Sequence, residues 1–147
     1  MPSLLLLIRL ALGAVFAFSG WQKVTAPVQN FEAVIEGFRV ISGGPAFFLA
    51  ATLPWVELIL GIFLFLGLWS RVSHATLWAM NTVFLGVLAS ALLRNLPIKE
   101  CGCFGEVLSL SLPRILAVDA ALWAFFLLLF VFSKKHPPAC LDDFLKK

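Results

Sequence analysis

The chain has 147 residues, of which 61% are hydrophobic and 13% are charged, and its formal net charge is +3. Soluble domains are about 45–50% apolar and about 25% charged, so this composition excludes a disordered chain, a disulfide-stapled secreted mini-protein and a conventional soluble enzyme. The positive charge is not gathered in a basic cluster with interleaved aromatic residues, so we expect no nucleic-acid partner. The composition indicates a protein that crosses the lipid bilayer several times.

Four apolar stretches are long enough to span a bilayer as helices, which takes roughly 20 residues each. They cover about residues 3–21, 45–69, 72–93 and 115–132. Their continuous apolar character lacks the alternation of a barrel strand. The sequence therefore predicts an all-α fold: an integral membrane four-helix bundle over residues 1–133, followed by a short charged tail over 134–147.

The connection between the first two stretches carries a second helical pattern. Phe31, Val34, Ile35 and Phe38 recur at helical spacing, and charged residues occupy the opposite face. This pattern is typical of a short interfacial helix that lies on the membrane.

Small residues recur at four-residue spacing within the four stretches, which allows helix backbones to approach closely in lipid. The pairs are Gly13/Ala17, Ala46/Ala50, Gly86/Ser90 and Ala117/Ala121. We expect these pairs to lie where helices pack against one another. Arg9, inside the first stretch, is expected to extend its charged head to the membrane interface.

The most informative local feature is the pair Cys101 and Cys103, between the third and fourth stretches. Two thiols one residue apart close only a strained disulfide, and Gly102 between them supplies the backbone freedom that such a ring requires. Strained, exposed disulfides have less negative potentials and behave as labile or catalytic ones. The spacing predicts a redox-active dithiol at the membrane surface.

Basic residues near this dithiol favour its thiolate form. Lys99 lies two residues before Cys101, which makes Cys101 the expected attacking thiol, and Arg94 and Arg114 bracket the connection. Two alternatives stay open, because thiolates also bind soft metals and because paired cysteines can be merely structural.

A zinc site that adds His136 and Cys140 to the cysteine pair is disfavoured by helix length. The last span lies between the two groups and rises roughly 27 Å as a helix. We therefore expect the two groups on opposite membrane faces and predict no metal site in this set.

Polar residues inside the apolar stretches are costly in lipid and usually serve a purpose. Glu57 lies in the second stretch, Asn81 in the third and Asp119 in the fourth, whereas Lys23 follows the first stretch on the cysteine side. Under a functional interpretation, Glu57 or Asp119 moves protons beneath the dithiol. Under a structural one, these residues form interhelical hydrogen bonds or a Lys23–Asp119 pair.

The same functional interpretation places a quinone head beneath the dithiol, with Lys23, Arg94 and Arg114 as the binding residues. Arg71 in the short second connection and the lysines at 134 and 135 favour cytoplasmic termini under the positive-inside rule. The cysteine connection would then face the cell exterior.

Three blocks resemble the DoxX/MauE-like family of small four-helix membrane proteins. They are RLALGAVFAFSGWQKVTAPVQNFEAV at the first span, LPWVELILGIFLFLGLWSR at the second, and CGCFG between the last two, which points to the MauE-like branch. The resemblance implies thiol–disulfide or sulfur redox chemistry, sometimes with quinone and with a thioredoxin-like partner. It supports Cys101 and Cys103 as the redox pair, and Glu57, Lys23 and Arg9 as recurring positions.

From these observations we expect a protein of the bacterial inner membrane that exchanges electrons between a soluble thiol or disulfide partner and quinone. Whether it is an enzyme in its own right, as a thiol–disulfide or sulfur:quinone oxidoreductase, stays open. The alternatives are a non-catalytic assembly subunit and a carrier of soft metals such as copper, zinc or mercury.

Overall fold

The computed structural model describes residues 2–96 and 112–133, and every element within these ranges is an α-helix. In chain order the helices are α1 (Pro2–Thr25), α2 (Val28–Gly37), α3 (Gly44–Leu66), α4 (Ser70–Leu93) and α5 (Leu112–Ser133). Four of them, α1, α3, α4 and α5, are long and apolar enough to cross a bilayer. The predicted all-α fold, with four long apolar helices and a short one between the first two, is confirmed.

Several helix boundaries differ from those expected by up to four residues, and two of these differences affect the arrangement of the bundle. The first helix continues four residues beyond Trp21, to Thr25, so Lys23 lies within its last turn. The third helix ends at Leu66, because Gly67 adopts a left-handed conformation with φ of 76° and closes the helix through backbone hydrogen bonds. The turn into α4 therefore comes three residues earlier than expected.

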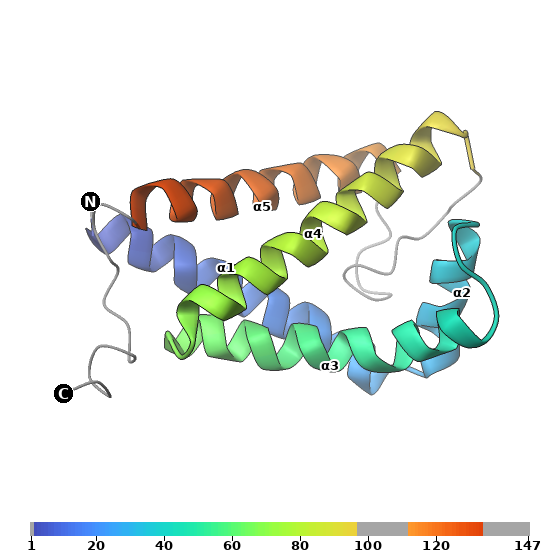
Figure 1. Cartoon of the computed structure of the whole chain (residues 1–147), viewed down its shortest axis with the longest axis horizontal. Helices are drawn as coiled ribbons and strands as arrows, with labels where there is room; N and C mark the ends of the chain where they lie inside the picture. The colour runs from blue at the N-terminus through green and yellow to red at the C-terminus, as the bar shows by residue number, and fades with distance from the viewer. Residues whose placement is uncertain (1, 97–111, 134–147) are drawn as a thin grey trace.

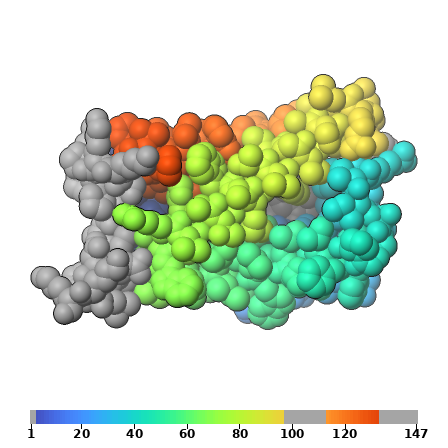
Figure 2. All heavy atoms as spheres, in the orientation of Figure 1, coloured from blue at the N-terminus to red at the C-terminus, as the bar shows by residue number. Residues whose placement is uncertain are grey.

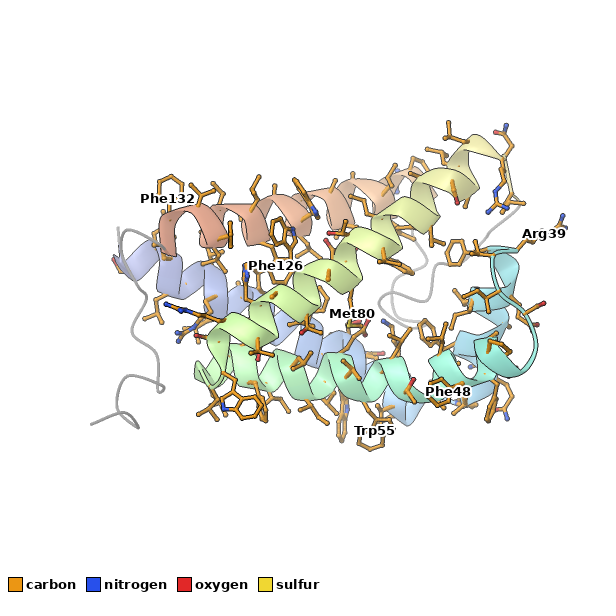
Figure 3. All side chains as sticks on the ribbon, in the orientation of Figure 1. Arg39, Phe48, Trp55, Met80, Phe126 and Phe132 are labelled. Carbon is orange, nitrogen blue, oxygen red and sulfur yellow. The ribbon has the colours of Figure 1, made fainter. Side chains whose placement is uncertain are left out.

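The long helices form two pairs that are joined into one bundle. In Figure 1, α1 and α3 lie side by side, whereas α4 crosses in front of the bundle and packs against α5. The ring of His74 forms a 3.0 Å hydrogen bond with the Phe126 carbonyl oxygen and so joins α4 to α5. Phe126 itself lies between these two helices (Figure 3) and is fully buried.

The bundle has two distinct ends. At one end lies the N-terminus, near the turn that joins α3 to α4, and at the other lies α2 (Figure 1). From their shared turn, α3 and α4 separate toward α2. Phe38 at the end of α2 packs with Leu88, Ala91 and Ile115, so α2 contacts the ends of α4 and α5 on that side.

Glycines allow α1 and α3 to approach with their backbones in contact. A methyl group at Gly20 would lie 2.5 Å from the Leu58 backbone nitrogen, and one at Gly61 would overlap the backbone of Ala17. Gly13 is packed against α3 in the same way. The small-residue spacing in the first span thus predicts a real interface, as expected for helix association in lipid.

The other small-residue pairs divide between buried and exposed positions. Ala46 and Ala50 are buried, as expected. For the remaining two pairs the expectation is wrong: a methyl group at Gly86 would meet no atom within 4 Å, and Ala117 and Ala121 are exposed. Spacing alone does not identify which face of a helix meets a neighbour.

Arg9 is buried within the protein, contrary to the expected extension to the lipid interface. It is 5% exposed, and its guanidinium lies against Gly67 in the turn between α3 and α4. The turn between α3 and α4 covers the Arg9 guanidinium, which was expected to meet lipid or water.

Replacing Gly61 by leucine should destabilise the protein by at least about 2 kcal/mol, because the added side chain meets backbone rather than a movable side chain. Thermal unfolding of the purified protein in detergent measures this change. Gly86→Leu is the matched control, since it enters open space and should leave the unfolding temperature nearly unchanged. Equal effects of the two substitutions would contradict the packing described for α1 and α3.

Candidate functional site

An ion pair joins α1 to α3 inside the bundle. The Lys23 ammonium donates a 2.6 Å hydrogen bond to Oε2 of Glu57, and the two side chains are only 6% and 14% exposed. The Lys23 nitrogen also lies 5.0 Å from the centre of the Phe31 ring, which stabilises the cation further. Charges within a membrane span are tolerated when they are paired in this manner.

Asp119 brings a third charged group to the same place from α5. It is 4% exposed, and its carboxyl group is close enough to interact electrostatically with both Lys23 and Glu57. The structural interpretation expected interhelical hydrogen bonds or a Lys23–Asp119 pair, and the structure shows one such interhelical hydrogen bond, from Lys23 to Glu57. Three of the residues selected from the sequence are thus brought together by three different helices.

A cavity of about 440 Å³ opens beside these charged groups. Its walls are predominantly apolar and come from all five helices, with Lys23, Glu57 and Asp119 among the lining residues. Asn81 also lines the cavity; it is 4% exposed, and its Oδ1 atom has no hydrogen-bond partner among the described residues. Because buried polar atoms are normally paired, this oxygen is available to a bound molecule.

The short helix α2 closes one side of the cavity, a role that sequence reasoning missed. Phe31 and Phe38 are buried and line the cavity together with Ile35. The apolar face of α2 is therefore covered by the bundle, where a helix lying on the membrane would turn it to lipid. The seven-residue spacing of the two phenylalanines was the available signal, but it is equally typical of both arrangements.

The two arginines proposed to bind a cofactor lie outside the cavity lining. The Arg94 guanidinium donates a 2.8 Å hydrogen bond to the Phe38 carbonyl oxygen and a 3.3 Å one to that of Ser90. It thus joins the end of α4 to the end of α2. Arg114 is exposed in the first turn of α5.

Cys101 and Cys103, together with Lys99, lie outside the described residues. The described chain stops at Leu96 and resumes at Leu112, and the neighbouring parts of α4 and α5 pack with Phe38 at the α2 end of the bundle. The segment that carries the dithiol is therefore attached at both ends to the side of the bundle where α2 lies.

Removing the cation of the buried cluster should destabilise the protein more than removing a carboxylate. Lys23→Met removes the cation that donates a hydrogen bond to the buried Glu57 carboxylate, and breaking a buried pair in this way costs about 3–5 kcal/mol. Glu57→Gln leaves Lys23 beside Asp119 and should cost less. Thermal unfolding of both variants in detergent measures the order, and a larger loss in Glu57→Gln would contradict the described electrostatics.

Comparison with known proteins identifies one family. The family described as methylamine utilisation protein MauE matches residues 1–132. No curated protein and no solved structure matches the chain. Because the match covers all four candidate spans, the chain belongs to the MauE family and is a multi-pass integral membrane protein.

Proposed function

We propose that the protein is a membrane thiol–disulfide redox protein in which Cys101 and Cys103 exchange electrons with a soluble partner and with a membrane quinone. The observation that carries this proposal is the apolar cavity with charged residues in its wall. It lies in the bundle to whose α2 end both ends of the cysteine segment are attached. Such a cavity suits the second electron carrier that a dithiol at the membrane surface needs.

The cavity suits a quinone in size and in chemistry. Its volume of about 440 Å³ falls within the range of about 300–1,000 Å³ that small-molecule sites occupy. The Lys23 ammonium can donate a hydrogen bond to a carbonyl oxygen, and Oδ1 of Asn81 can accept one from a hydroxyl. Apolar walls around these groups suit the remainder of such a molecule.

The exchange with the soluble partner passes through a mixed disulfide. The Cys101 thiolate attacks a partner disulfide, bonds to one sulfur and releases the other as a thiolate. Cys103 then attacks the Cys101 sulfur, which frees the second partner thiolate and leaves a Cys101–Cys103 disulfide. Two electrons pass to the partner, the two thiolates it now carries take up protons, and the reverse sequence oxidises a partner dithiol.

A bound quinone or quinol supplies the chemistry that completes the cycle, by taking up or giving back two electrons and two protons. The carboxyl groups of Asp119 and Glu57 hold and move those protons at their oxygen atoms. Asp119 suits transfer toward the cysteines, because it lies seven residues after Leu112, or about 10 Å along α5. The Lys23 hydrogen bond holds Glu57 in a fixed orientation.

The partner in this proposal is a thioredoxin-like or other soluble thiol protein outside the cell membrane. With cytoplasmic termini, the cysteine segment of a protein in the bacterial inner membrane faces the periplasm, where protein disulfides persist. The name of the family suggests a process, methylamine utilisation, in which such a redox protein could mature a disulfide-containing partner.

Cys103→Ser should accumulate a mixed disulfide between Cys101 and the partner, because the thiol that resolves the intermediate is missing. Non-reducing gels of membranes, followed by mass spectrometry of the shifted band, measure this species. Cys101→Ser should give much less of it. Cys140→Ser, which alters the chain's third cysteine, is the matched control and should behave as the unmodified protein.

The double variant Cys101→Ser with Cys103→Ser tests the proposal against the assembly-subunit alternative. We expect it to lose cell function completely, since neither of the thiols that exchange with the partner remains. Retention of partner binding and of cell function in this variant would overturn the redox proposal. Stoichiometric copper or zinc that is lost in the same variant would favour the metal carrier.

A further inference from the structure

The polar part of the cavity wall, which Lys23, Glu57, Asn81 and Asp119 form and which we call its floor, is suited to a neutral head group. Among its charged lining residues, the acidic Glu57 and Asp119 outnumber the basic Lys23, so an anionic head such as a phosphate would be repelled. Lys23 offers a hydrogen-bond donor, and the unpartnered Oδ1 of Asn81 offers an acceptor. A neutral ring that carries carbonyl or hydroxyl oxygens satisfies both groups.

The opening of the cavity, in contrast, is apolar and lies on the side of the helix bundle. Its apolar rim consists of Val40, Ile41 and Val83. These residues line the cavity and are 55%, 37% and 69% exposed. Val83 lies near the middle of the membrane-spanning helix α4, at a depth where hydrocarbon surrounds the protein. Figure 2 shows the surface hollowed between α4 and α3 beside α2, which are the helices that separate in Figure 1.

We propose that a molecule dissolved in the bilayer enters the cavity sideways between α3 and α4. Its neutral head lies between Lys23 and Asn81, and its apolar tail leaves past Val83 into the hydrocarbon. A water-soluble ligand is disfavoured, because it would have to cross the apolar rim. This inference rests on the proposed function in taking the head to be that of a quinone, and it adds an entry route and a recognition residue.

The route is tested by photolabelling the unmodified protein in phosphatidylcholine nanodiscs. The probe is a ubiquinone analogue with a diazirine in its alkyl tail, and peptide mass spectrometry locates the label. We expect labelling of the rim, on the connection from α2 to α3 and on α4, including the peptide that contains Val83. Excess unlabelled ubiquinone should suppress it strongly, whereas excess phosphatidylethanolamine should not.

Three substitutions, one of them a control, sharpen the test. Val83→Trp should block the rim and remove most of the labelling, whereas Val72→Trp, at another exposed valine of α4 that does not line the cavity, should leave it unchanged. Asn81→Leu should weaken quinol binding about tenfold, since one buried hydrogen bond is lost. Thermal unfolding shows whether each variant is folded.

The results also separate this inference from the proposed function. Labels confined to the outer faces of the bundle, or suppressed equally by phosphatidylethanolamine, would overturn the lateral route and the quinone head. If the rim is labelled but Cys101 and Cys103 never change oxidation state, the redox proposal fails and the binding site stands. If the cysteines cycle with a partner but the rim is not labelled, the redox proposal stands and this inference fails.

Discussion

A lysine and a glutamate that meet inside the helix bundle impose the main constraint on this structure. The Lys23–Glu57 pair is stable in a membrane only if protein surrounds it, so α1 and α3 must lie close together at that depth. Glycines at 20 and 61 make this approach possible by bringing the two backbones into contact. Phe31 covers the ion pair from α2, and Asp119 reaches it from α5. The cavity and its polar floor follow from this arrangement.

Much of the fold follows from the sequence because the bilayer restricts which backbone structures can span it. Apolar runs of about 20 residues have to form helices in lipid, and the short amphipathic pattern around Phe31 adds α2. Lys23, Glu57 and Asp119 were identifiable as site residues because each is a charged group within or beside an apolar span. The structure places all three at one cavity.

What the sequence could not predict depends on helix rotation and on tertiary contacts. The sequence does not tell whether Glu57 accepts a hydrogen bond from Lys23, and it is the approach of α1 to α3 that brings the two side chains together. The apolar face of α2 could cover lipid or protein, and the contacts of Phe38 decide for protein. Asn81 becomes a binding candidate only once its oxygen is found buried and unpartnered at the cavity. Arg94 looked equally suited to ligand binding, but it hydrogen-bonds the end of α2.

The proposed redox cycle requires electrons to pass between the Cys101–Cys103 pair and a quinone in the membrane. In the most direct test, the reduced protein in nanodiscs is mixed with excess ubiquinone. Both the quinol that forms and the free thiols that remain on the protein are then measured. The account predicts that each molecule of quinol is matched by one closed Cys101–Cys103 disulfide, and that the protein with both cysteines replaced by serine forms none. Thiols that stay reduced throughout, or quinol formed equally by the serine variant, would contradict it.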